Sequence, residues 1–370
     1  DSLGIEIDAS VRTERLDLQQ CKLVEIAKAM YWQPKILVVD ETTTALSQTG
    51  RNLLYKLMRK MADEGGSVMF ISHDLDEMME HCDAVTVLRD GNIIGSLDKE
   101  EFDGNKMKEM MVGREVSGNY YRNDNDSYED EITLKAHCIT TRKDLLCFNL
   151  ELHKGEVLGI GGLSECGMHT VGKALFGYEK ILDGKVTVGA KQTVVKNPET
   201  AIANGIAYTS KDRDHESLGL AGSIRDNIAS TGYYFNRIFG PIISFGKEKK
   251  FVQNQIDTLE LKCASQYHSV NTLSGGNKQK VVFGKWIGSE ADVLILDCPT
   301  RGIDIGVKAS MYQLIYKMKK QGKSIILISE ELPELIGMSD RILIMKDGKI
   351  VHEAMRSENP TEHDLINYMI

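Results

Sequence analysis

An internal repeat constrains the fold of this chain more than any other feature of the sequence. The run Ile36–Asp40 (ILVVD) reappears 257 residues later as Val293–Asp297 (VLILD). The same offset carries Asp83 to Asp340, and no gap is needed between these points. A register held over so long a stretch predicts two copies of one domain type.

Each copy alternates short apolar runs with helical patterns. In the first copy, runs at 36–39 and 68–71 flank a helical pattern over 48–62. Continuous apolar runs between helices predict strands buried on both faces, and therefore an α/β fold with a parallel sheet. The polar stretch 117–131 has no aliphatic residue and predicts an exposed linker. We therefore expect a first domain within 1–116 and a second over 132–370.

Composition excludes some classes of protein. The 45 basic and 54 acidic residues give a net charge of −9, which argues against a general nucleic-acid binder. No apolar run approaches the roughly 18 residues of a membrane helix. The seven cysteines contain no CxxC pair, so neither a zinc site nor a disulfide framework is indicated. A reducing, cytoplasmic setting is the simplest interpretation.

The first copy carries candidate catalytic residues after its apolar runs. Asp40 ends one run, at the edge of the sheet where nucleotides bind, and a carboxylate there can hold Mg²⁺ through water. Glu41 follows directly, and His73 comes one strand later. The carboxylate of Glu41 could polarise water for attack on a γ-phosphate, and an imidazole could bond the same phosphate. The alternative is an aspartate that only caps a turn.

The second copy carries a candidate phosphate-binding segment, LSGGNKQ at 273–279, before a helical pattern. Ser274 is a good helix N-cap, and Gly275 and Gly276 would let a phosphate approach the backbone N–H groups at the positive helix end. Asn277 follows them. An ordinary serine-capped helix is the alternative. The order of this helix and the following Asp297 strand recurs at the same offset, which argues against that alternative.

Together these motifs resemble those of ABC-type ATPases, with LSGG as the signature and VLILD as the Walker B strand. Five stretches resemble more narrowly the tandem ATP-binding subunits of bacterial monosaccharide importers of the ribose, galactose and xylose type: 24–30, 110–114, 273–281, 299–306 and 337–342. The resemblance implies two nucleotide-binding domains in one chain. Each would have a RecA-like core, an antiparallel β subdomain (132–195 in the second domain) and a helical subdomain that carries the signature.

The resemblance also implies ATP and Mg²⁺ as cofactors and a role for each motif. In such dimers each ATP lies between the P-loop and Walker B strand of one domain and the signature of the other. One composite site would therefore use Glu41 and His73 for catalysis and Asp40 for Mg²⁺. The opposite signature would bind the same ATP through Ser274, Gly275, Gly276 and Asn277.

The other composite site departs from the family pattern. Gly162 and Gly167 keep the P-loop spacing, but Met168 replaces its lysine and His169 its Mg²⁺-binding hydroxyl. Methionine cannot donate to a phosphate, and imidazole is a poor Mg²⁺ ligand. The remaining members of this site are equally altered: Asp17 and Gln20 in the first signature, Cys298 after Asp297, and Glu330 in place of a histidine. The sequence thus predicts one competent and one degenerate site.

We expect the energy-coupling ATPase of a sugar importer, peripheral on the cytoplasmic face of the membrane. Its partners would be permease subunits and, indirectly, an extracytoplasmic sugar-binding protein, with no nucleic acid. A soluble tandem ATPase acting on ribosomes or nucleic acid, or a non-catalytic fragment, is the alternative. Spacing within the second domain places the first P-loop before residue 1. We therefore expect an incomplete first domain, exposed apolar surface on strands such as 36–39, and little activity in this chain alone.

Overall fold

The computed structural model describes residues 7–8, 10–13, 16, 18–72, 74–89, 92–112, 121–122, 124, 127–163, 165–235, 244–288 and 291–369. The chain forms two compact units, Asp1–Ser117 (unit 1) and Gly118–Ile370 (unit 2). Two predicted site residues, Asp17 and His73, lie outside the described residues.

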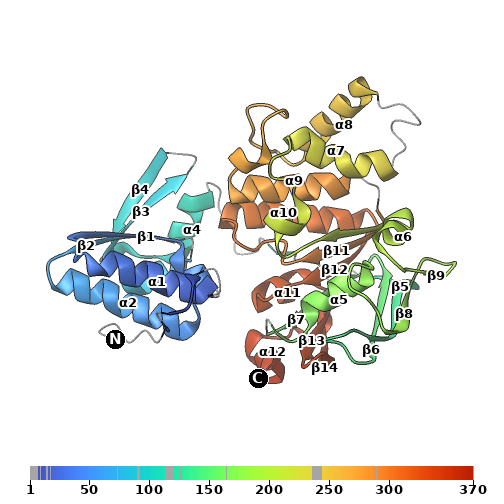
Figure 1. The fold of residues 1–370 in the computed structure, drawn as a ribbon, viewed down its shortest axis with the longest axis horizontal. Coiled ribbons are helices and arrows are strands. Elements are labelled where there is room, and N and C mark those ends of the chain that lie inside the picture. Colours follow the sequence, from blue (N-terminus) through green and yellow to red (C-terminus); the bar gives the residue numbers. More distant parts are fainter. Residues whose placement is uncertain are drawn as a thin grey trace. The chain divides into compact units, whose positions relative to one another are not determined.

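Unit 1 combines helices with two short sheets (Figure 1). Its elements are α1 (Leu18–Tyr31), β1 (Ile36–Asp40), η2 (Thr42–Ala45), α2 (Gln48–Asp63), β2 (Ser67–Ile71), α3 (Leu75–His81), β3 (Ala84–Arg89), β4 (Asn92–Asp98), η3 (Lys99–Glu101) and α4 (Gly104–Val112). Strands β1 and β2 pair in parallel, whereas β3 and β4 pair antiparallel. The predicted order of helices and strands in the first copy is confirmed.

Unit 2 contains a larger α/β core. Its elements are β5 (Glu129–Thr140), β6 (Phe148–Lys154), β7 (Val157–Gly162), α5 (Met168–Leu175), β8 (Asp183–Val188), β9 (Thr193–Val194), α6 (Pro198–Ala203), β10 (Ile206–Thr209), η4 (Arg213–Ser217), α7 (Ile224–Phe235), α8 (Phe245–Thr258), η5 (Val270–Thr272), α9 (Gly275–Ile287), β11 (Val293–Asp297), α10 (Ile305–Lys320), β12 (Ser324–Ile328), α11 (Leu332–Met338), β13 (Arg341–Lys346), β14 (Lys349–Met355), η6 (Arg356–Glu358) and α12 (Glu362–Met369). The main sheet has the order β10-β11-β12-β7-β13-β14 and is parallel except at β13–β14. The edge of this sheet at the carboxyl ends of its parallel strands is where ligands bind in such folds.

Two further layers complete unit 2. An antiparallel sheet has the order β6-β5-β8-β9, as predicted for the segment around 132–195, although β7 in that interval joins the main sheet. Helices α7, α8 and α9 share a separate apolar core. Among the described residues, no helix has the length and apolar character that crossing a membrane requires.

The repeat seen in the sequence is also a repeat of structure. Strands β1, β2, β3 and β4 begin and end 257 residues before β11, β12, β13 and β14, and the same holds for α2 with α10 and α3 with α11. Hydrogen-bonded pairing agrees as well, because β1–β2 and β11–β12 are parallel and β3–β4 and β13–β14 antiparallel. One pattern of side chains therefore builds the same local structure twice.

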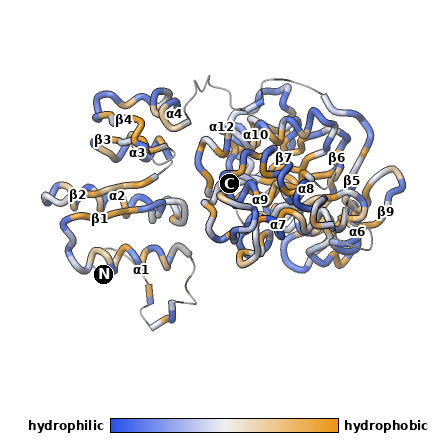
Figure 2. The backbone as a smooth tube through the Cα atoms, turned by 90° about the horizontal axis from the view of Figure 1, so that it is seen from above, coloured by the Kyte–Doolittle hydropathy of each residue, from blue (hydrophilic) through white to orange (hydrophobic). Residues whose placement is uncertain are grey.

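Strand burial differs between the copies. Every residue of β7, β11 and β12 is buried, as predicted for strands covered on both faces. In β1 only alternate residues are buried: Leu37 and Val39 contribute to a core shared with α1 and α2. Ile36 and Val38 are 67% and 56% exposed, although the strand is mostly hydrophobic (Figure 2). Burial on both faces is therefore wrong for this strand, and the expected exposed apolar surface is confirmed.

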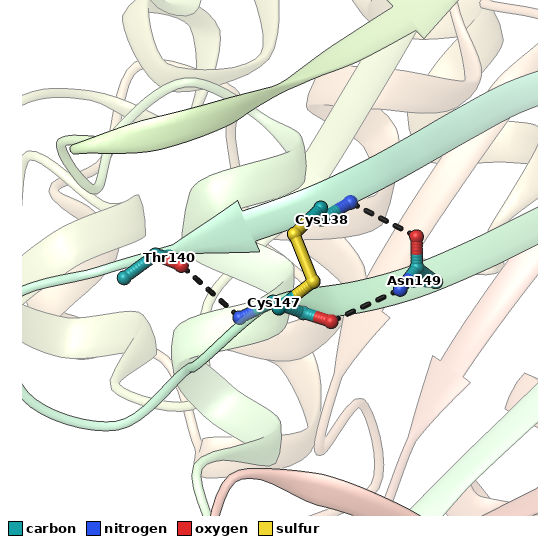
Figure 3. Close-up of a disulfide and its surroundings, with 4 residues drawn as sticks. All are labelled: Cys138, Thr140, Cys147 and Asn149. Atoms are coloured by element: carbon teal, nitrogen blue, oxygen red, sulfur yellow. Dashed lines mark hydrogen bonds between the residues drawn. A yellow bond between two sulfur atoms is a disulfide. The ribbon is translucent and has the colours of Figure 1, made fainter.

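A disulfide joins Cys138 in β5 to Cys147 just before β6 (Figure 3). The backbone N–H of Cys138 donates to Asn149 Oδ1 over 2.9 Å, and that of Cys147 to Thr140 Oγ1 over 3.0 Å. The absence of a disulfide inferred from the sequence is wrong here. Neighbouring antiparallel strands bring together two cysteines whose spacing forms no recognised motif.

The interpretation of 117–131 as an exposed linker does not hold at Arg122. This side chain is fully buried, and its guanidinium pairs with Asp340 over 2.7 Å and with Asp124 over 2.9 Å. Arg356 adds a hydrogen bond to the carbonyl of Arg122. A polar composition predicted exposure, but paired charges allow a polar segment to be buried.

Candidate nucleotide site

The carboxyl end of β1 places two acidic side chains at an exposed turn. Asp40 ends the strand, and Glu41 adopts a left-handed conformation with φ 43°. The N–H of Glu41 donates to the carbonyl of Ile71, the last residue of β2, over 3.0 Å. A non-glycine residue held in this conformation by a neighbouring strand is typical of functional turns. Asp40 and Glu41 are therefore exposed at the carboxyl end of β1, the edge at which ligands bind in many α/β sheets.

A buried glutamate ties this turn to the end of β2. Glu77, in α3, accepts a hydrogen bond from Thr43 Oγ1 over 2.9 Å and another from Ser72 Oγ over 3.0 Å. The hydroxyl of Tyr55 donates to its other oxygen over 2.7 Å. Thr43 follows Glu41 by two residues, and Ser72 directly precedes position 73. Glu77 thus holds together the two segments that carry the predicted catalytic residues.

Unit 2 has the same backbone turn and the same buried glutamate, but a different side chain at the tip of the turn. Cys298 takes the place of Glu41, with φ 48°, and its N–H donates to the carbonyl of Ile328 over 2.8 Å. Glu334 takes the place of Glu77 and accepts a hydrogen bond from Thr300 Oγ1 over 2.7 Å. Complete burial raises the pKa of Glu334 from 4.5 to about 7. Burial also raises the pKa of the Cys298 thiol, so the thiol stays protonated at neutral pH.

The degenerate P-loop runs from β7 to α5. Gly167 precedes α5 with φ 94°, a conformation that favours glycine. A Cβ atom on Gly162 would lie 2.4 Å from Cys166 Sγ and 2.6 Å from the carbonyl of Met345, so packing requires a glycine at position 162. Met168 is fully buried in the main core. The residue in the lysine position is thus directed into the protein.

His169 lies between two carboxylates at the start of α5. Its Nδ1 is 2.7 Å from Asp297 Oδ1, and its Nε2 is 3.4 Å from Glu330 Oε1. Lys211 Nζ donates to the same Glu330 oxygen over 2.6 Å. Burial lowers the pKa of His169, but the hydrogen bonds with Asp297 and Glu330 outweigh it, so the pKa lies above its ordinary value.

This arrangement does not fit a magnesium–ATP site. The carboxylate of Asp297 is fully buried; one oxygen lies against His169, and the other accepts a hydrogen bond from the Tyr208 hydroxyl over 3.4 Å. A hydrated Mg²⁺ needs hard oxygen ligands, and here imidazole and a thiol occupy the neighbouring positions. The side chains around Asp297 therefore do not suit a hydrated Mg²⁺.

The signature segment begins α9. Ser274 takes the N-cap position, but its hydroxyl does not bond the helix backbone; Asn277 Nδ2 donates to it over 3.1 Å instead. The predicted side-chain cap is thus wrong, although the helix starts where expected. A Cβ on Gly275 would lie 2.9 Å from the Arg213 guanidinium, and one on Gly276 would lie 2.9 Å from Val307. Both glycines therefore also accommodate neighbours within unit 2.

The structure brings together His169, Asp297, Cys298 and Glu330, four of the residues predicted for the degenerate site. Gln20 lies in the first turn of α1, in unit 1. Lys211 and Tyr208, which the structure places beside His169 and Asp297, were not among the predicted site residues. Glu77 and Glu334 were also missed, although the offset of 257 residues pairs them.

Comparison with known proteins identifies the family. A family model described as ABC transporter matches residues 145–301. The ribose import ATP-binding protein of Bacillus cereus is 35% identical over 348 residues, which cover 94% of this chain and 70% of that protein. The chain belongs to the ATP-binding proteins of ABC transporters. It is therefore an ABC-type ATPase.

Other relatives and solved structures agree with this family. The galactose/methyl galactoside import ATP-binding protein of Clostridium tetani is 34% identical, with 99% of this chain and 72% of that protein covered. A dimeric ATP-binding cassette bound to ADP and Pi matches with a TM-score of 0.53 and 19% identity, covering 60% of this chain and 98% of that one. At this identity the structural match supports the ABC ATPase fold alone.

Proposed function

We propose that this protein is the energy-coupling subunit of an importer for simple sugars. The observation that carries the proposal is the 34–35% identity, over nearly the whole chain, to ATP-binding proteins named for ribose and galactose import. Permease subunits would be its direct partners, and a sugar-binding protein outside the membrane an indirect one. Its place would be peripheral, on the cytoplasmic face of the membrane.

ATP hydrolysis in this proposal depends on the carboxylates of unit 1. Glu41 would polarise the attacking water, His73 would bond the γ-phosphate, and Asp40 would hold Mg²⁺ through water. The signature residues Ser274, Gly275, Gly276 and Asn277 would contribute to ATP binding. The exposed turn after β1 supports this assignment, as does the engagement of Asp297 by His169.

The proposal includes two ABC domains, of which the first is incomplete. In unit 2, β7 lies between β12 and β13 and pairs in parallel with both. In unit 1 the equivalent strands β2 and β3 belong to separate sheets, and their residues 68–71 and 84–88 line a cavity of about 890 Å³. A strand equivalent to β7 would fit there. The loop after such a strand would then lie at the same edge as Asp40 and Glu41.

Assembly with a permease tests this function. The full-length protein is produced together with candidate permease subunits from the same organism, and membranes are assayed for its retention and for ATPase activity. We expect retention on the membrane and stimulation by a sugar-loaded binding protein, but not by the unloaded one. Sedimentation with ribosomes, with no ATPase response to the binding protein, would instead support the alternative of a soluble tandem ATPase.

A further inference from the structure

Three potential metal ligands converge beside the degenerate P-loop. His169 comes from α5, Asp297 ends β11, and Cys298 follows it in the left-handed turn. One ligand atom from each lies within 4.8 Å of the other two. Asp297 and Cys298 are buried, and His169 is 18% exposed. All three residues belong to unit 2, whereas Asp40 and Glu41 belong to unit 1.

The donor types point to a particular class of ion. Imidazole, thiolate and carboxylate together suit Zn²⁺, whereas Mg²⁺ prefers oxygen ligands alone. A tetrahedral Zn²⁺ with bonds of about 2.0–2.3 Å keeps its ligand atoms roughly 3.5 Å apart, so small side-chain rotations suffice here. We propose that His169, Asp297 and Cys298 bind a transition-metal dication of the zinc type, in place of magnesium–nucleotide.

The groups around the cluster match those that orient metal ligands. A ligating imidazole ordinarily donates its other N–H to a carboxylate, and His169 Nε2 lies 3.4 Å from Glu330 Oε1. The second oxygen of Asp297 accepts a hydrogen bond from the Tyr208 hydroxyl over 3.4 Å. Both groups leave His169 Nδ1 and Asp297 Oδ1 directed toward each other, 2.7 Å apart.

The nearby lysine does not occupy this position. Lys211 Nζ lies 3.1 Å from Nε2 of His169 and 2.6 Å from Glu330 Oε1, on the opposite edge of the ring from Nδ1. A bound dication would take the place of the proton shared by His169 and Asp297, and would also displace the proton of the Cys298 thiol. It would then join the start of α5 to the end of β11.

Cobalt is the most direct probe, because Co²⁺ bound to a thiolate in a tetrahedral site absorbs visible and near-ultraviolet light. The whole chain is treated with chelator, titrated with Co²⁺ and then with Zn²⁺, and the stoichiometry of Zn²⁺ is measured by equilibrium dialysis. We expect one ion per chain, a thiolate-to-cobalt band, and loss of that band when Zn²⁺ displaces Co²⁺.

Variants locate the site. Cys298→Ser keeps the shape of the side chain and should abolish the thiolate band, while Cys263→Ser, which changes a cysteine outside the cluster, should leave it intact. His169→Gln and Cys298→Ser should each weaken Zn²⁺ binding at least tenfold, and Glu330→Gln by about tenfold. Circular dichroism confirms that each variant is folded.

Two results would overturn the proposal. One is a chain that binds no stoichiometric Zn²⁺ and gives no thiolate band with Co²⁺. The other is Zn²⁺ binding of equal strength in the parent chain, Cys298→Ser and His169→Gln, which would place the ion elsewhere. Neither result bears on sugar import, because the observation that carries that proposal is the identity to sugar-import ATP-binding proteins.

Discussion

The turns that follow β1 and β11 have the same backbone conformation but differ in how exposed their acidic side chains are. Both strands end in aspartate followed by a left-handed residue, Glu41 with φ 43° and Cys298 with φ 48°. In unit 1 the aspartate and the glutamate are exposed. In unit 2 the aspartate is fully buried and lies 2.7 Å from His169.

The comparison shows that the conformation of this turn does not depend on which side chain stands at position 41 or 298. The N–H groups of Glu41 and Cys298 donate to carbonyls of the neighbouring strand, at Ile71 and Ile328. These bonds use only the backbone, so the side chain at the tip can change without loss of the fold. We therefore attribute the difference between the two ends to their side chains.

The largest expected difference is between matched positions in β1 and β11. Ile295 is fully buried, whereas Val38, 257 residues earlier, is 56% exposed. Ile295→Lys would bury an unpaired charge and should cost roughly 4 kcal/mol or more. Val38→Lys should stay within about 0.5 kcal/mol of the parent chain. Denaturation followed by hydrogen exchange of each strand measures both; equal losses would mean that β1 is covered like β11.

The two buried glutamates should respond with opposite sign to substitution by glutamine. The pKa of Glu334 is raised from 4.5 to about 7, so its ionisation costs stability as the pH rises through that interval. Glu334→Gln removes this cost and should stabilise unit 2 at pH 8 by up to about 3 kcal/mol, with little effect at pH 4. The measurement is the pH dependence of unfolding in the parent chain and the variant. A gap that stays constant with pH would contradict it.

Glu77→Gln provides the matched comparison in unit 1. Three hydroxyl groups donate to this carboxylate, from Thr43, Ser72 and Tyr55. An amide nitrogen cannot accept from them, so we expect a loss of about 1–3 kcal/mol in unit 1 at neutral pH. Hydrogen exchange at α3 and at the ends of β1 and β2 should rise. Stabilisation of unit 1 by this change would refute the positioning role given to Glu77.

A smaller effect is expected at His169. Its pKa is raised, so its pairing contributes fully below the unfolded value of 6.5 and is lost as the pH rises through the folded value. His169→Gln should therefore destabilise unit 2 by roughly 1.5 kcal/mol at pH 6, with the gap closing at high pH. Chelator is present throughout, so that no metal contributes. A gap that widens with pH would mean that the imidazole is neutral in the folded state.

Much of the fold could be predicted from the sequence, because the repeat shows the pattern of each helix and strand twice. Leu37 and Val39 were correctly placed in strands, and the exposure of Ile36 followed from the spacing of the motifs. Long-range pairing could not be predicted in this way: the charge of the buried Arg122 is compensated by Asp124 and also by Asp340, more than two hundred residues away. The pairing of Cys138 with Cys147 likewise depends on strand register.

Candidate site residues could be predicted where they lie in a motif, but not where their role depends on contacts between distant segments. Asp40, Glu41, Ser274 and His169 lie in motifs whose spacing carries the information. Glu77 resembles any helical glutamate in the sequence, and only the hydrogen bonds from Thr43 and Ser72 show its role. Lys211 acquires its role from a carboxylate on another loop. The catalytic and binding roles of Asp40, Glu41, His73, Ser274 and Asp17 stay predictions.

The most direct test of the account is whether one carboxylate, Glu41, sustains ATP hydrolysis in the transporter assembled with its permease. We expect Glu41→Gln to lower kcat at least about 100-fold, the range for loss of a general base. Glu64→Gln, an exposed glutamate of the same unit, should retain parental activity. Adding Cys298→Glu to Glu41→Gln should restore nothing, because Asp297 is held by His169. Activity within a few-fold of the parent in Glu41→Gln, or its recovery through Cys298→Glu, would contradict the account.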